Sequence, residues 1–255
     1  MELAGKTAVI TGSTGALGSE LAFALAKAGC NCVCHYHENR EKAEELVGDI
    51  EAMSRRAGSA GSPRAVAVKA DLTEPQQIEA LFEAASRFAP VQILINSAGI
   101  FGRTPLSEIS INQSRRVLDL NLTACILTAK AFAQSIAQTA KDKDAPAGKI
   151  INICDVAATK PWAQYSLYCA SKAGLIGATK ALAKELAPRI LVNALSPGIA
   201  ARPTEMTAEE EKRQLSFIPM RRFAETKEIA AAMMFLLEND YITGQVLNVC
   251  GGRAI

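Results

Sequence analysis

Residues 7–18, TAVITGSTGALG, join a short apolar run to a turn that contains three glycines. The run predicts a buried strand over Thr7–Thr11, and the apolar spacing of Ser19–Ala28 predicts a helix that stops at Gly29. Glycine lets a backbone approach a phosphate closely, and a helix N-terminus offers unpaired N–H groups. The stretch therefore predicts a dinucleotide site, with an ordinary glycine-containing turn between strand and helix as the alternative.

Short apolar runs alternate with helical patterns along the rest of the chain. The further predicted strands are Cys30–His35, Arg64–Ala70, Val91–Ile95, Lys149–Ile153, Ile190–Leu195 and Gln245–Val249. The further predicted helices are Arg40–Met53, Glu74–Phe88, Ile109–Ala137, Tyr165–Ala187 and Lys227–Leu237. Seven strands with helical crossovers predict an α/β fold, a doubly wound parallel sheet with helices on both faces. We expect one domain over residues 1–255, with a substrate loop at about 199–220.

Composition limits the classes of function. The chain has 255 residues, 49% of them hydrophobic, and a formal net charge of +2. A nucleic-acid-binding protein would show a basic stripe, whereas the basic pairs here are scattered among acids. No apolar run approaches the roughly 20 residues of a membrane span, and Met1–Lys6 is too short for a signal peptide. We expect a cytoplasmic protein that acts on a small molecule and binds neither nucleic acid nor membrane.

The cysteines predict neither disulfides nor a metal site. There are seven, an odd number, and no pair has the C-x-x-C spacing. Cys30, Cys32 and Cys34 alternate along one predicted strand, so neighbours would lie roughly 6.6 Å apart and be poorly aimed for bridging. We expect reduced, buried thiols. The only two histidines, His35 and His37, lie on the same segment, so we expect no metal.

Tyr168 and Lys172 are four residues apart within a predicted helix and therefore share one face of it. A free phenol has a pKa of about 10, and a neighbouring ammonium lowers it. The pair therefore predicts proton-transfer chemistry. Packing and solvation are the alternative explanation for such a pair.

Several motifs are spaced along the predicted strands and helices. They are Thr11–Gly18, Asn96–Gly99, Asn121, Tyr168–Lys172 and Ser196–Gly198. Together they resemble the short-chain dehydrogenase/reductase family over the whole chain. The resemblance implies a Rossmann fold, a nicotinamide cofactor and a homotetramer with the helices of Asn121 and Tyr168 at its interfaces. It also implies that Tyr168 is the general acid or base. Lys172 would bind the nicotinamide ribose and lower the pKa of Tyr168, and Asn121 would hold a water in the proton relay.

The resemblance and the turn chemistry together assign the cofactor-binding residues. They are Gly12, Ser13, Thr14, Leu17, Gly18, Tyr36, His37, Asn39, Arg40, Asp71, Leu72, Asn96, Ala98, Gly99, Pro197 and Gly198. An acid at the end of the second strand would bind the adenosine 2′-hydroxyl and repel a 2′-phosphate. Tyr36 stands there instead, and the basic and amide side chains after it can meet a phosphate. We therefore expect NADPH, unless Glu38 turns inward and repels the phosphate.

Two positions depart from the family pattern. Ala16 replaces the middle glycine of the turn, and its small methyl should leave cofactor binding intact. Asp155 stands thirteen residues before Tyr168, where the family has its catalytic serine. A serine would hydrogen-bond a substrate carbonyl, whereas a carboxylate would repel a developing oxyanion unless it were protonated. Asp155 is better suited to anchoring or protonating a nitrogen heterocycle.

Asp155 is shared with one branch of the family, and the chain is similar to the pteridine reductases. His35–His37 matches the cofactor-specificity strand of that branch. Phe101 matches the phenylalanine that stacks a pterin against the nicotinamide, and Trp162 and Tyr165 would line the pocket. The resemblance implies an NADPH-dependent reductase of a dihydropterin-type C=N bond, with Tyr168, Lys172, Asp155 and Asn121 as catalytic residues. The arginine usual in that branch is absent at Ala16.

Two other functions stay open. One is a carbonyl reductase such as a 3-oxoacyl-carrier-protein reductase, to which the chain is also similar. Its carrier protein would need a basic patch, for which Arg115, Arg116, Arg221 and Arg222 are candidates, although solvated faces explain them equally well. The other is a non-catalytic NADP(H)-sensing protein, which has no evident need for Tyr168, Lys172 and Asn121 together.

Overall fold

The computed structural model describes residues 1–57, 63–139, 146–200 and 206–255. Its centre is a seven-stranded parallel sheet with the strand order β3-β2-β1-β4-β5-β6-β7. The strands are β1 (Thr7–Thr11), β2 (Asn31–Tyr36), β3 (Ala65–Lys69), β4 (Ile93–Asn96), β5 (Gly148–Ile153), β6 (Ile190–Pro197) and β7 (Val246–Val249). The predicted doubly wound α/β sheet is confirmed.

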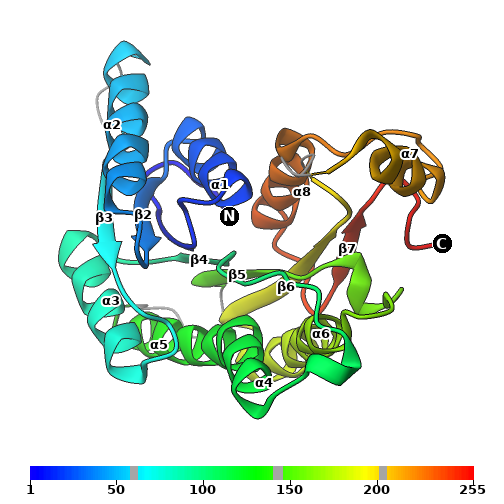
Figure 1. The fold of residues 1–255 in the computed structure, drawn as a ribbon. Helices are drawn as coiled ribbons and strands as arrows, with labels where there is room; N and C mark the ends of the chain where they lie inside the picture. The colour runs from blue at the N-terminus through cyan, green and yellow to red at the C-terminus, as the bar shows by residue number, and fades with distance from the viewer. Residues whose placement is uncertain (58–62, 140–145, 201–205) are drawn as a thin grey trace.

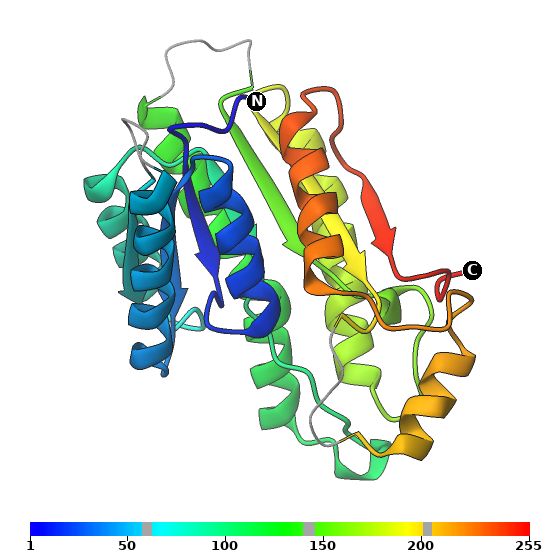
Figure 2. The same cartoon turned by 90° about the horizontal axis from the view of Figure 1, so that it is seen from above.

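Helices cover both faces of this sheet. Figure 1 shows α1, α2 and α8 above the sheet and α3, α5 and α6 below it, and Figure 2 shows the same layers from above. These helices are α1 (Ala16–Lys27), α2 (Arg40–Ala57), α8 (Thr226–Glu238), α3 (Pro75–Phe88), α5 (Ala124–Thr139) and α6 (Ser166–Leu186). Because both faces are covered, every residue of β1 is buried, as is usual for parallel strands.

The strand order reverses between β1 and β4. In open parallel sheets, ligands bind outside the carboxyl ends of the strands at such a point. Thr11, at the end of β1, ties the two turns together. Its Oγ1 accepts hydrogen bonds from the backbone N–H groups of Ser97 and Ala98, at 3.0 and 3.1 Å. A Cβ on Gly12 would lie 2.7 Å from Cα of Ala98, so the turns after β1 and β4 are in direct contact.

The predicted helix Ile109–Ala137 is interrupted in the structure. It begins with α4 (Ile111–Leu118), continues as a π-helical turn (Asp119–Thr123) and ends as α5. By length and composition the run Ile111–Gln138 could cross a membrane, although sequence analysis expected no such stretch. The run packs beside α3 and α6 within the domain, which is the position of a core helix.

The expected substrate loop at 199–220 contains a helix that the sequence analysis did not predict. This is α7 (Ala208–Ser216), whose first turn is closed by a capping box between Thr207 and Glu210. Residues 201–205 of the expected loop lie outside the described residues. The long loop prediction missed the Thr-x-x-Glu signal that starts a helix.

The cysteines lie where the sequence analysis expected them. Cys30, Cys32 and Cys34 are fully buried in the apolar core on the α1 and α8 side of the sheet. All seven thiols are free, and six are buried. Burial raises the pKa of the Cys30 thiol to about 12, so it is protonated and unreactive at neutral pH.

Candidate active site

The glycine-rich turn leads directly into α1, and the first turn of this helix has no side-chain cap. Its N-cap is Gly15, and no acidic residue lies in the first turn. A Cβ on Gly18 would lie 2.3 Å from the carbonyl oxygen of Gly12, so only glycine allows this approach. Ala16 is exposed, and its methyl fills no space inside the turn. An uncapped helix N-terminus of this kind fits the pyrophosphate of a dinucleotide.

A buried histidine holds this turn in place. His35 Nδ1 accepts a hydrogen bond from the N–H of Gly12, and its Nε2 lies 3.0 Å from the carbonyl oxygen of Ala70. Because a carbonyl can only accept, the partners assign the proton to Nε2 and make the ring neutral. Burial lowers the pKa of His35 to about 4. Sequence analysis gave His35 no such role, because its partners come from two distant turns.

The residues expected to select a 2′-phosphate lie just beyond β2. Tyr36 is buried at the end of the strand, and the exposed residues after it are His37, Glu38, Asn39 and Arg40. The Glu38 side chain is 88% exposed, so it does not turn into the site. Arg40 Nε donates to Glu44, which holds the guanidinium on the outer surface of α2. A phosphate contact from this group stays a prediction.

The residues expected to flank the adenine lie just after β3. Two hydrogen bonds from Thr73 hold the Asp71 carboxylate and lower its pKa. His37 Nε2 lies 3.6 Å from the same carboxylate. Leu72 is buried and packs into the core beneath the site. Adenine contacts from Asp71 and Leu72 stay predictions.

Two of the predicted cofactor residues turn their side chains inward. Ser13 Oγ donates to the carbonyl oxygen of His35. Asn96 Nδ2 donates to Asn152, and its Oδ1 accepts from Thr128. Both side chains therefore stabilise the fold, and a cofactor contact would fall to their backbone atoms. The other predicted cofactor residues near β1, β4 and β6 are Thr14, Leu17, Ala98, Gly99, Pro197 and Gly198.

Tyr168 and Asp155 meet at the end of β5. The Tyr168 hydroxyl donates a hydrogen bond of 2.8 Å to Asp155 Oδ2. The other carboxylate oxygen accepts from the N–H of Ala157 and caps the short 3₁₀ turn Val156–Ala158. The carboxylate that replaces the family serine is thus fixed from two sides and touches the predicted proton donor.

Lys172 and Asn121 lie on the inner side of this pair. Lys172 Nζ donates to the carbonyl oxygen of Ile153 at 2.8 Å and lies 6.0 Å from the centre of the Tyr168 ring. Asn121 is fully buried in the π-helical turn. It accepts from the N–H of Ile100 and donates to the carbonyl oxygen of the same residue. Asn121 therefore fixes the turn after β4 against the helix of Tyr168.

The expected lowering of the Tyr168 pKa is wrong for this arrangement. Burial and the neighbouring Asp155 carboxylate raise the pKa of Tyr168 well above its ordinary value. Burial also raises the pKa of Asp155. Negative charge on either group disfavours ionisation of the other. Tyr168 is therefore held as a neutral phenol that can deliver a proton.

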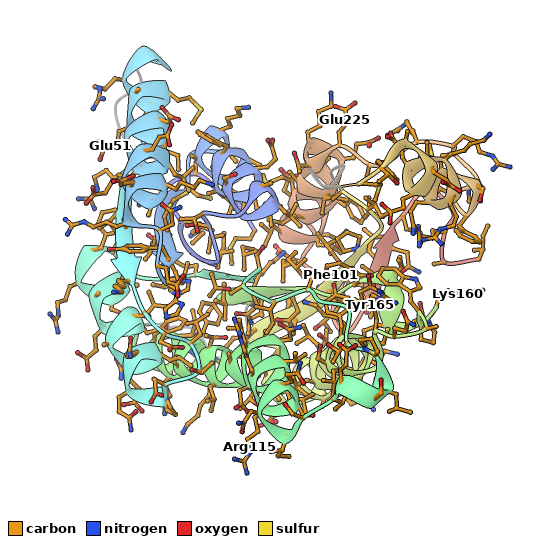
Figure 3. The ribbon with its side chains drawn as sticks, viewed as in Figure 1. Glu51, Phe101, Arg115, Lys160, Tyr165 and Glu225 are labelled. Carbon is orange, nitrogen blue, oxygen red and sulfur yellow. The ribbon has the colours of Figure 1, made fainter. Side chains whose placement is uncertain are left out.

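Four aromatic side chains, which we call the aromatic wall, stand beside this pair: Phe101, Trp162, Tyr165 and Tyr168. Phe101 stacks on Tyr165 with ring centres 5.2 Å apart and meets Tyr168 edge-on at 4.9 Å. Figure 3 shows Phe101 and Tyr165 close together. Phe101 is 62% exposed, so its ring is not part of the core. The wall therefore offers a flat apolar surface next to the proton donor.

Arg253 extends the aromatic wall, and sequence analysis did not find it. Its guanidinium lies over the ring of Trp162 at 5.2 Å and over Phe217 at 6.0 Å. Nη2 donates to Gln214 of α7. Arg253 follows the last strand with no recognisable motif, so only the folded chain brings it here.

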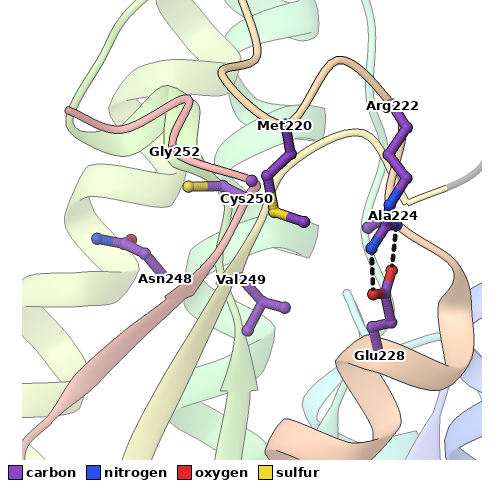
Figure 4. Close-up of a pocket in the computed structure, with 9 residues that line it drawn as sticks. Met220, Arg222, Ala224, Glu228, Asn248, Val249, Cys250 and Gly252 are labelled. Carbon is purple, nitrogen blue, oxygen red and sulfur yellow. Dashed lines mark hydrogen bonds and ion pairs between the residues drawn. The ribbon is translucent and has the colours of Figure 1, made fainter.

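A separate cavity of about 330 Å³ lies between the end of β7 and the start of α8. Figure 4 shows its wall, where Arg222 forms two hydrogen bonds with Glu228 at 2.6 and 2.7 Å. Other lining residues include Met220, Asn248 and Cys250. None of the aromatic wall lines this cavity, so it is distinct from the Tyr168 site.

Comparison with known proteins identifies the family. The family model described as "short chain dehydrogenase" matches residues 6–215. The chain belongs to the short-chain dehydrogenase/reductase family. It is 35% identical to a 3-oxoacyl-[acyl-carrier-protein] reductase of Synechocystis sp., over 99% of this chain and 98% of the relative. It is 37% identical to 3beta-hydroxysteroid dehydrogenase 1 of Eggerthella lenta, over 100% and 95% of the two chains.

A solved structure agrees with this family. The blue fluorescent protein from a metagenomic library, crystallised in complex with NADPH, has a TM-score of 0.86 and 30% identity, and the match covers 100% of both chains. This short-chain dehydrogenase/reductase is therefore an oxidoreductase with the fold of an NADPH-binding protein. The relatives named here include oxoacyl and steroid enzymes and no pteridine reductase. They match the carbonyl reductase alternative better than the pteridine interpretation.

Proposed function

We propose that this short-chain dehydrogenase/reductase is an NADPH-dependent reductase of a flat nitrogen heterocycle with a C=N bond, of the dihydropterin type. The observation that carries the proposal is the 2.8 Å hydrogen bond from Tyr168 to the Asp155 carboxylate. A carboxylate here opposes an oxyanion but accepts hydrogen bonds from ring N–H groups. The exposed ring of Phe101 supplies a surface on which such a heterocycle can stack.

The residues of this chain supply positioning and a proton. When bound, a nicotinamide cofactor would supply the hydride for the ring carbon of the C=N bond. The Tyr168 hydroxyl hydrogen turns from Asp155 to the ring nitrogen and is transferred there as a proton, which breaks the hydrogen bond to Asp155. Lys172 and Asn121 fix the floor of the site through Ile153 and Ile100. The donated proton is replaced from solvent.

NADPH rather than NADH is proposed on the residues after β2. Tyr36 rather than an acid ends β2, and the Glu38 side chain points to solvent. Arg40 begins α2 on the exposed surface, and Asn39 before it accepts from the N–H of Lys42, so a 2′-phosphate would meet a helix N-terminus here. Titration of the protein with NADPH and with NADH measures the preference, and we expect the lower Kd for NADPH.

Oxidation of NADPH with three substrates tests the proposed function. A dihydropterin, dihydrofolate and an acetoacetyl thioester are compared at equal concentration. We expect the highest kcat/KM with a dihydropterin-type compound. Asp155→Ser should lower that value by about 10²-fold, on the scale of a lost acid–base group, with an unchanged Kd for NADPH. Activity on the thioester alone would overturn the proposal.

A second candidate is a 3-oxoacyl-carrier-protein reductase, and the 35% identity to the Synechocystis enzyme favours it. Arg222 is paired with Glu228, which leaves Arg115 and Arg116 on α4 as the exposed basic pair. Figure 3 shows Arg115 pointing away from the fold. In this case Arg115→Glu should lower the rate with a carrier-protein thioester and leave the rate with the free thioester unchanged.

A further inference from the structure

Arg253 enters the site from the end of the chain. It lies in the turn after β7, and Figure 1 shows this C-terminal segment beside α7. The guanidinium covers Trp162 and is tied to α7 through Gln214. The aromatic wall thus has Tyr168 at one end and a cation at the other.

One nitrogen of this guanidinium lacks a partner. Arg253 Nη1 is shielded from solvent, and none of the residues that the structure describes gives it a hydrogen bond. Leaving a buried charged donor unpaired is costly, so an acceptor at this point would stabilise the protein. Burial also lowers the pKa of Arg253, and the charge of Asp155 offsets part of this effect.

The nearest negative group does not fill this role. Asp155 is near enough for its charge to interact with that of Arg253. No ion pair joins these two residues within the described chain, and the carboxylate oxygens are used by Tyr168 and Ala157. Nη1 is closed to solvent in this conformation, so a ligand on the aromatic wall would reach it once the Arg253 side chain turns outward, and would then supply the missing acceptor.

We propose that Arg253 is a specificity-determining residue that binds a carboxylate of the substrate, so that the site takes a flat ring with an acidic substituent. A carboxylate matches the free donor in geometry, neutralises the guanidinium and gains a charge-assisted hydrogen bond. The inference rests on the proposed function only in placing the substrate on the same aromatic wall. The proposed substrate carries a negative charge whether the bond that is reduced is C=N or C=O.

The test uses benzoate and benzamide, a flat carboxylate and its neutral counterpart of similar shape. Trp162 is the only tryptophan of the chain, so its fluorescence reports binding at Arg253. We expect benzoate to bind the wild-type protein at least about tenfold more tightly than benzamide, on the scale of one charge-assisted hydrogen bond. Arg253→Gln should abolish this preference while leaving the Kd of benzamide unchanged.

Two further variants make the result specific. Arg213→Gln removes the same charge from an exposed position of α7 and should leave the preference for benzoate intact. Asp155→Asn removes the opposing carboxylate and should strengthen benzoate binding. Equal binding of benzoate and benzamide to the wild-type protein would overturn the inference, as would an unchanged preference in Arg253→Gln. Neither outcome depends on turnover, so the proposed function would stand or fall separately in the NADPH assay.

Discussion

Tyr168 stays protonated because of the residues that touch it. Its hydroxyl is buried and donates to Asp155, and both conditions raise its pKa. A phenolate beside a carboxylate is unfavourable, so abstraction of a proton from an alcohol is disfavoured. Tyr168 is therefore a neutral phenol at physiological pH, and a ligand must offset the charge of Asp155 before the phenol can give up its proton.

The pH profile of reduction should depend on the charge of Asp155. Asp155→Asn keeps an oxygen that can accept from Tyr168 but removes the negative charge. The pKa of Tyr168 should then fall, so the alkaline loss of kcat/KM should begin at lower pH than in the wild-type protein. Rates measured from pH 6 to 11 check this, because that range spans the ordinary phenol pKa of about 10. An alkaline limb that stays in place would contradict the assigned interaction.

His35 should make the fold sensitive to mild acid. Its folded pKa is about 4, below the ordinary value of 6.5, because the ring is buried. The unfolded chain therefore binds the proton first, and stability falls as the pH drops from 6.5 toward 4. Each pH unit in this window costs about 1.4 kcal/mol. Urea unfolding at pH 7.5 and pH 5 should differ by about 2 kcal/mol from this residue.

The control is the second histidine of the chain. His35→Asn should remove most of this acid-dependent loss and also weaken NADPH binding, since Gly12 loses its fixed acceptor. His37→Asn alters an exposed ring and should keep the wild-type pH dependence. If His37→Asn removes the dependence and His35→Asn does not, the role assigned to His35 is wrong.

At the scale of elements, a buried lysine closes the end of α8. Lys149 is the second residue of β5 and is 1% exposed. Its Nζ donates to the carbonyl oxygens of Leu237 and Asn239, each at 2.6 Å, and pairs with Asp240 at 2.7 Å. The last carbonyls of a helix have no partner within the helix. One strand thereby fixes the helix that flanks the site.

Removal of this lysine should destabilise the whole domain. Lys149→Met should lower the free energy of unfolding by about 2–4 kcal/mol, because buried carbonyls lose a charged donor. Asp240→Asn alters a half-exposed partner and should cost about 1 kcal/mol or less. Urea unfolding of both variants measures the two losses in the free energy of unfolding. Equal losses would show that the ion pair, and not the helix cap, carries the effect.

At the scale of the molecule, the homotetramer implied by the family stays a prediction. Ile126 of α5 is 38% exposed on one of the helices expected at an interface. Light scattering should give a mass of four chains for the wild-type protein. Ile126→Lys should lower that mass, because a buried unpaired charge opposes association. Gln138→Lys, at an exposed position near the end of the same helix, should not. A monomeric wild-type protein would contradict the prediction.

The sequence by itself determined the sheet, the glycine turn and the Tyr168–Lys172 pair. Apolar runs and glycines act locally, so strand β1 has its predicted bounds and α2 starts at its predicted residue. Helix starts such as that of α7 were missed where a capping signal lay inside an expected loop.

Only the tertiary structure decided the chemistry of the site. The raised pKa of Tyr168 depends on burial and on Asp155, which local spacing cannot reveal. The roles of His35 and Arg253 depend on partners far away in the chain. Spacing along one helix determines which residues share a face, but charge and desolvation depend on every segment that packs around a group. For that reason the sequence predicted the Tyr168–Lys172 pair, and the fold determined that Tyr168 is held in its protonated form.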